Sequence, residues 1–176
     1  MTEELKPLLE ANYAIDDGDE TLIGVSLGGL FAAWVLLTAP FWFDRYLLVS
    51  PALFWNSEEV WRWEEAQALK EKDLPASVFV SAGELETRTE LRRYAVRIAE
   101  SNPTVHRGLR DAIEWNDRHG WPRFSEITGE FADGLQSRKY PKLRIHCNNM
   151  PDETHQSVPP AAISRGLRYV FGFWQP

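Results

Sequence analysis

The chain has 176 residues, 44% of them hydrophobic, which is long enough for one domain with a sizeable core and short for two, so we expect a single domain over residues 1–176. A net charge of −7 argues against nucleic acid or an anionic membrane surface as the main partner and favours a small neutral substrate. The single cysteine, Cys147, excludes an internal disulfide framework and a cysteine-rich zinc site, as expected for a cytoplasmic protein. The acidic N-terminus lacks a signal-peptide pattern, and no apolar run reaches the roughly 20 residues of a membrane span.

Apolar periodicity predicts an alternation of helices and strands. In chain order we expect a helix over 2–12, a strand over 21–25, a helix over 27–37, a strand over 45–52, a helix over 57–72, a strand over 76–83, a helix over 87–100, helical pieces near 107–118 and 129–138, a strand over 143–150 and a helix over 161–174. Strands that are apolar on both faces and alternate with helices indicate an α/β fold with a doubly wound, mostly parallel sheet covered by helices.

The first strand leads into the motif Gly24-x-Ser26-x-Gly28, followed by an apolar helix. This pattern is typical of a nucleophile elbow, in which a serine on a strained strand-to-helix turn projects above the end of a parallel sheet. Glycines suit the positions where strand and helix nearly touch. The N–H of Leu27, at the first turn of the helix, would face a developing oxyanion. Because no lysine follows the glycines and Ser26 replaces a second glycine, phosphate and dinucleotide loops are disfavoured.

Partners for Ser26 are expected in loops that follow other strands, because the carboxyl ends of parallel strands share one edge of the sheet. His155 follows the fourth predicted strand, and Glu84 and Glu86 follow the third. The chain order serine, acid, histidine matches that motif. We expect His155 to act as the base and Glu86 to orient it. Glu84 is the alternative acid, and with neither the site would be a Ser/His dyad.

The sequence offers two further candidate features, a pair of aromatic residues and a possible metal site. Phe54 and Trp55 follow the second strand and would line a substrate pocket, although tryptophans in a small domain are more often core. A metal site of Asp152, His155 and His146 has no recognised ligand spacing, so we expect no metal and no cofactor.

With the segments GVSLGGLFA, SPALFW and PDETHQSV in place, the chain resembles the Putative esterase family of α/β-hydrolases, nearest to its siderophore-esterase branch. The resemblance runs from about Glu3 to Phe173. It implies Ser26 as the nucleophile and His155 as the base, and it suggests siderophore lactones as substrates. It leaves the acid open, because members of that branch differ there. Val25 stands where the family usually has histidine.

The resemblance also implies that the N-terminal strands of the fold are missing. Family members carry well over a hundred residues before the motif, which form half of the sheet and supply a second oxyanion donor. An uncovered strand beside Ser26 would be an association hazard, so we expect a homo-oligomer, a partner chain or poor solubility.

The leading function hypothesis is a serine hydrolase that cleaves small carboxylic esters. One alternative is a truncated, catalytically impaired fragment that acts as a binding or interaction module. A third is an acyltransferase that uses the same residues.

Overall fold

The computed structural model describes residues 3–16, 18–101 and 106–173. Within these residues the elements are α1 (Leu5–Asn12), β1 (Thr21–Val25), α2 (Leu27–Thr38), the 3-10 turn η1 (Pro40–Trp42), β2 (Arg45–Val49), α3 (Trp55–Glu58), α4 (Val60–Lys70), β3 (Ser77–Gly83), the 3-10 turn η2 (Glu84–Glu86), α5 (Arg88–Ser101), α6 (His106–His119), α7 (Phe124–Ser137), β4 (Arg144–Met150) and α8 (Val158–Val170). The predicted alternation of strands and helices is confirmed.

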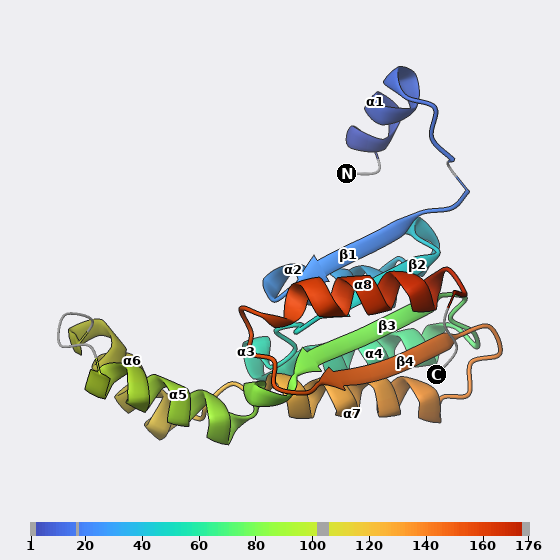
Figure 1. The fold of residues 1–176 in the computed structure, drawn as a ribbon. Coiled ribbons are helices and arrows are strands. Elements are labelled where there is room, and N and C mark those ends of the chain that lie inside the picture. Colours follow the sequence, from blue (N-terminus) through green and yellow to red (C-terminus); the bar gives the residue numbers. More distant parts are fainter. Residues whose placement is uncertain (1–2, 17, 102–105, 174–176) are drawn as a thin grey trace.

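The strands of the described chain form one four-stranded sheet in the order β1-β2-β3-β4, with every neighbouring pair parallel (Figure 1). The register pairs Val25 with Val49 and Val49 with Ser81, so the strands end close to one line. All carboxyl ends therefore lie along one edge of the sheet, and the loops that follow them share that edge.

Helices cover both faces of the sheet. Alternate strand residues such as Tyr46 and Leu48 pack against α2, α4 and α7, while Leu47 and Phe79 pack against α8 on the other face. This is why β2 and β3 are apolar at consecutive positions rather than at every second one. The α/β fold with a parallel sheet covered by helices is thus as predicted.

The helices α5 and α6 form a hairpin that projects away from the sheet (Figure 1). Of the α5 side chains, only Ala99 is fully buried. The hairpin is therefore an extension at the carboxyl edge of the sheet rather than part of the main core.

The structure corrects several predicted boundaries. The helix expected over 57–72 begins only at Val60, because Asn56 and Ser57 have left-handed backbone angles (φ 51° and 57°) that interrupt α3. The helical piece expected over 129–138 starts earlier, at Phe124. The helix expected over 161–174 spans Val158–Val170, so Phe171 lies just past its end and is 42% exposed, and Trp174 lies outside the described residues.

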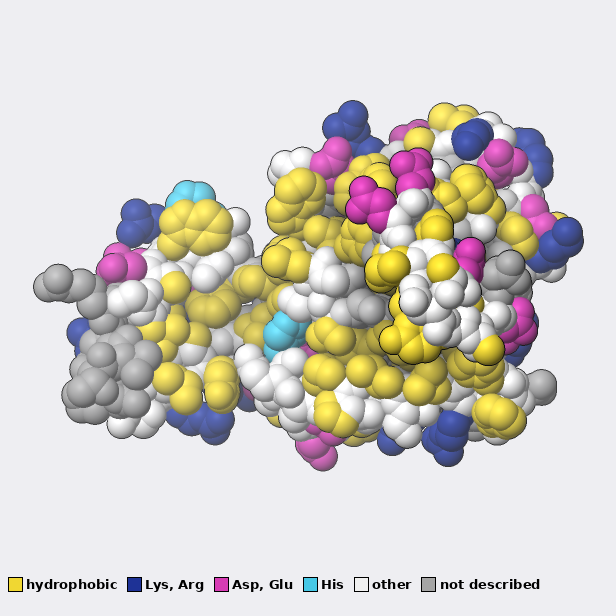
Figure 2. Space-filling view, turned by 90° about the horizontal axis from the view of Figure 1, so that it is seen from above, with side chains coloured by type: hydrophobic (Ala, Val, Ile, Leu, Met, Phe, Trp, Pro, Cys, Tyr) yellow, Lys and Arg dark blue, Asp and Glu magenta, His cyan; other side chains and the backbone are white. Residues whose placement is uncertain are grey.

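Strand β1 lies at one end of the sheet order, and the surface around it is apolar. Ile23 on β1 and Leu27, Phe31 and Trp34 on α2 are 37–65% exposed. Figure 2 shows apolar side chains spread widely over the molecule when it is viewed from above. No helix among the described residues is long and apolar enough to cross a membrane.

Candidate active site at the carboxyl edge of the sheet

Ser26 occupies a strained turn between β1 and α2. Its backbone angles, φ 56° and ψ −116°, lie outside the regions that residues with a side chain prefer. Its N–H donates to the Val49 carbonyl at 3.0 Å, and its own carbonyl accepts from the N–H groups of Leu30 and Ala52, each at 3.0 Å. Three backbone hydrogen bonds therefore hold this residue in a conformation that it would not adopt alone.

The glycines around Ser26 differ in how tightly they are required. A Cβ on Gly24 would lie 2.0 Å from the Gly28 carbonyl oxygen, and one on Gly29 would lie 2.9 Å from Cα of Pro51. A Cβ on Gly28 would meet nothing within 4 Å. The expectation that neither motif glycine has room for a side chain is therefore wrong for Gly28. It is the backbone carbonyl of Gly28 that leaves no room for a side chain at Gly24.

Leu27 is the first residue of α2, so its N–H belongs to the first turn, where donors have no partner within the helix. The side chain of Leu27 is 65% exposed. The positive end of the helix macrodipole adds to the attraction of this N–H for an anion that forms beside Ser26.

His155 lies in the loop between β4 and α8 and is hydrogen-bonded to Glu86. The distance from Nδ1 of His155 to Oε2 of Glu86 is 2.6 Å. When Nδ1 carries the proton that it donates to the carboxylate, Nε2 is left as a free base. Of the two glutamates that the sequence offered, Glu86 is the partner of His155.

Glu86 is completely buried, and each of its oxygens has a partner. Oε1 accepts from the Ser50 hydroxyl at 2.6 Å and from the Gly83 N–H at 2.7 Å, while Oε2 faces His155. A buried carboxylate is tolerated only when it is hydrogen-bonded in this way. These partners fix the carboxylate and, through it, the orientation of the imidazole.

Ser50 is a residue of the site that the sequence did not reveal. It follows β2 directly, has a positive φ of 42°, and is fully buried. The sequence placed it inside an apolar strand, where a serine gives no signal of its own. In the structure it links the end of β2, next to the Ala52 contact with Ser26, to Glu86.

Glu84 has a different place from Glu86. Its carboxylate accepts the backbone N–H of Asp152 at 3.2 Å, and the side chain is exposed. The neighbouring Leu85 N–H donates to the Glu153 carbonyl at 3.1 Å. These contacts tie the turn after β3 to the loop that carries His155.

Gly83 allows this close approach of the two loops. A Cβ at Gly83 would lie 2.2 Å from the Glu153 carbonyl oxygen and 3.0 Å from Oε1 of Glu86. Any side chain there would push the His155 loop away from the Glu86 carboxylate.

One aromatic ring packs against the imidazole, and a second packs against the first. The ring centroids of Phe124 and His155 are 4.5 Å apart, and Phe54 packs edge-to-face on Phe124 at 4.8 Å. Trp55 is 48% exposed and lines a separate cavity of about 470 Å³ with Trp115 and other residues of the α6–α7 region. The ring of Phe124 thus lies between Phe54 and His155, and Trp55 lines a neighbouring cavity.

Other reactive side chains lie elsewhere. Burial raises the pKa of the Cys147 thiol to about 11, so the thiolate that would make it a nucleophile does not form near neutral pH. Burial lowers the pKa of His146, which lies within β4. Among residues 3–16, 18–101 and 106–173, no group of three or more His, Cys, Asp or Glu side chains is placed to hold a metal ion, and Asp152, His146 and His155 form no such group.

Comparison with known proteins gives a consistent family. The sequence model of a family described as Putative esterase matches residues 1–123. The chain is 28% identical over 172 residues to the ferri-bacillibactin esterase BesA of Bacillus subtilis and 29% identical over 177 residues to a siderophore enterobactin esterase of Emericella nidulans, in each case over 97% of this chain.

A solved structure shows the same fold. The BES protein from Bacillus cereus superposes with a TM-score of 0.69 at 29% sequence identity, covering 96% of this chain and 51% of that one. The chain spans 49% of BesA and 54% of the fungal esterase, about half the length of the curated relatives that it matches.

Proposed function

Because the chain belongs to the Putative esterase family, we propose that it is a serine hydrolase that cleaves carboxylic esters through Ser26, His155 and Glu86. The observation that carries the proposal is the hydrogen bond between His155 and the buried Glu86, at the same edge of the sheet as the strained Ser26 turn. Together these residues form a catalytic triad on a nucleophile elbow.

The first half of the proposed reaction forms an acyl-enzyme. Nε2 of His155 takes the proton from the Ser26 hydroxyl as the oxygen attacks the ester carbonyl carbon. The carbonyl oxygen becomes an oxyanion, which accepts a hydrogen bond from the Leu27 N–H. When the intermediate collapses, the bond to the alcohol oxygen breaks, and His155 returns the proton to that alcohol.

The second half releases the acid. Water gives a proton to His155, and its oxygen attacks the acyl carbon. The bond to the Ser26 oxygen then breaks, and the proton moves from His155 back to Ser26. Throughout, Glu86 holds Nδ1 protonated and stabilises the imidazolium, so that one tautomer presents Nε2 to both steps.

The relatives indicate the substrate class. BesA is named as a ferri-bacillibactin esterase and the fungal relative as a siderophore enterobactin esterase. We extend to this chain the coarser property that they share, hydrolysis of small esters of the siderophore type, with Phe54 and Trp55 as candidate contacts to the substrate. Their aromatic faces suit a ring-bearing ester.

Hydrolysis of p-nitrophenyl acetate tests the proposal. We expect turnover by the wild-type chain, no turnover above background by Ser26→Ala, and unchanged turnover by the control Ser137→Ala, which alters an exposed serine at the end of α7. Folded wild-type protein that does not hydrolyse the ester, or a Ser26→Ala variant that retains the wild-type rate, would refute it.

A second candidate is an impaired fragment that serves as an interaction module. It is favoured by the coverage of only about half of each relative and by the exposed apolar surface along β1 and α2. Loss of one oxyanion donor typically lowers the rate by about 10²- to 10³-fold. A folded chain that neither turns over esters nor reacts with serine-directed probes would support this alternative.

A further inference from the structure

A cavity of about 300 Å³ opens beside His155 and extends along α5. The loop residues Thr154, His155 and Gln156 form one wall. The facing wall is α5, which contributes Leu91, Tyr94, two arginines, Arg93 and Arg97, and Glu90, whose carboxylate pairs with Arg93. The cavity therefore runs from the proposed base to a cationic stretch of helix.

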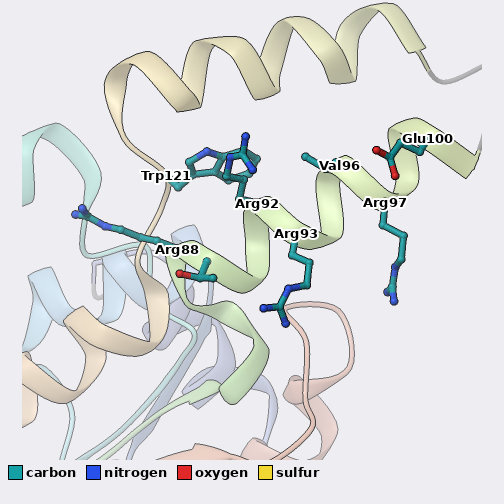
Figure 3. A pocket seen from close by; sticks show the side chains of 8 residues that line it. Arg88, Arg92, Arg93, Val96, Arg97, Glu100 and Trp121 are labelled. Atoms are coloured by element: carbon teal, nitrogen blue, oxygen red, sulfur yellow. The ribbon is translucent and has the colours of Figure 1, made fainter.

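Both arginines lie on the side of α5 that faces this cavity. In Figure 3, Arg93 and Arg97 point to one side of α5, whereas Trp121 and Glu100 lie on the other side. Positions four apart on a helix lie on one face, so the two guanidinium groups line one strip. They border both this cavity and a second hollow of about 520 Å³, which is lined by α5 residues and Trp121.

The arginines of α5 differ in whether they have a carboxylate partner. Arg92 is held by both carboxylate oxygens of Asp117, at 2.8 and 3.0 Å, and Arg93 lies 2.7 Å from Glu90. Arg97 lies over the Tyr94 ring at 5.7 Å and has no carboxylate partner among the described residues. An arginine left without an anion, at the wall of a cavity next to the base, is a ready partner for an anionic ligand.

The position of the cavity says which part of an ester it would hold. His155 must return its proton to the leaving alcohol, so that alcohol has to lie next to the imidazole. The cavity is lined by His155 and leads from it to Arg97. The group bound there is therefore the alcohol portion of the ester and not the acyl portion.

From this geometry we propose that the cavity is a subsite for an anionic leaving alcohol, whose negative group pairs with Arg97 and, second to it, Arg93, while its apolar body lies against Leu85, Leu91 and Tyr94. The inference rests on the proposed function. It also replaces the expectation of a neutral substrate, because the net charge of −7 describes the whole chain, whereas the substrate meets the local field of α5.

A matched pair of esters tests the subsite. In 4-acetoxyphenylacetate the leaving phenol carries a carboxylate, and in 4-acetoxyphenylacetamide a neutral amide of the same size replaces it. We expect the wild-type chain to have the higher kcat/KM for the carboxylate, after correction for hydrolysis by hydroxide. Added salt should reduce this preference.

Variants test which residues cause the preference for the carboxylate ester. Arg97→Gln should reduce the ratio of kcat/KM for the carboxylate over the amide by about tenfold, the worth of one charge-assisted hydrogen bond. Arg93→Gln should lose less, because Glu90 already balances that charge, and Arg97→Lys should retain part. Arg110→Gln, an exposed arginine of α6 outside both hollows, is the control. Equal rates on the two esters in the wild type, or an undiminished preference in Arg97→Gln, would overturn the subsite.

A binding measurement distinguishes failure of the proposed subsite from failure of the proposed function. If the wild type hydrolyses neither ester, the proposed function fails, and the subsite is then tested by calorimetric titration with 4-hydroxyphenylacetate, the leaving alcohol itself. We expect the Arg97→Gln variant to bind it about tenfold more weakly than the wild type. No binding by the wild type, or equal binding by the variant, would overturn the subsite independently of catalysis.

Discussion

Glu86 and His155, 69 positions apart in the chain, are joined by a hydrogen bond of 2.6 Å between Oε2 and Nδ1. The carboxylate is buried and the imidazole is partly exposed. A buried acceptor that holds one nitrogen of a partly exposed histidine sets the tautomer and leaves the other nitrogen for chemistry. The pair lies at the carboxyl edge of the parallel sheet, the edge at which open α/β sheets generally bind ligands.

Glu86→Gln tests whether this pair orients the base. The amide can donate to Nδ1 and so favours the wrong tautomer of His155. We therefore expect kcat for p-nitrophenyl acetate to fall by about 10²- to 10⁴-fold, with a smaller change in KM. Steady-state kinetics measures the fall, and circular dichroism shows whether the variant remains folded.

Ser50→Ala is the matched control for that variant. It removes the donor to the other carboxylate oxygen, Oε1, and leaves both the Gly83 N–H and the His155 contact in place. We expect a much smaller loss of kcat than for Glu86→Gln. A folded Glu86→Gln variant with wild-type kcat would show that the site works as a Ser/His dyad.

Gly24→Ala and Gly28→Ala test the packing of the Ser26 turn. A Cβ at Gly24 collides with the Gly28 carbonyl, so we expect the free energy of unfolding to fall by about 3 kcal/mol or more. Gly28 lies in α2 with open space around it, so alanine there should be neutral or stabilising by up to about 1 kcal/mol. Urea denaturation compares the two, and equal destabilisation would contradict the packing described.

The exposed strand β1 predicts self-association of the isolated chain. Ile23 lies on this edge strand and is 40% exposed, and α2, which packs against β1, carries further exposed apolar side chains. Apolar edge strands pair with other chains, and a lysine on the edge opposes this pairing. We expect Ile23→Lys to lower the average mass in sedimentation experiments, whereas Leu69→Lys, at a 79% exposed position of α4, should not. A wild-type chain that stays monomeric at high concentration would refute the prediction.

The sequence predicted those parts of the fold whose local signals agree with the tertiary structure. The run from Thr21 through Trp34 has an apolar strand, a glycine-flanked serine and an apolar helix, and each signal leads to the same conformation. The loop after β4 was likewise readable, because a polar segment that contains His155 follows the predicted strand.

The parts that could not be predicted depend on contacts between distant segments. The sequence favoured Glu86 but left Glu84 open as the alternative acid, and only the 3-10 turn η2 turns Glu84 toward solvent and Glu86 into the core. Ser50 matters because its hydroxyl meets a carboxylate 36 positions away. The sequence analysis assigned no role to Arg93 and Arg97, because only the fold places them around one cavity with His155.

Labelling with a fluorophosphonate probe, mapped by mass spectrometry, tests the central claim most directly, because the probe reacts only with an activated serine. We expect one label on Ser26 in the folded wild-type chain, none in Ser26→Ala, and labelling slowed by about 10²-fold or more in His155→Ala. A folded wild-type chain that stays unlabelled, or a His155→Ala variant labelled at the wild-type rate, would contradict it.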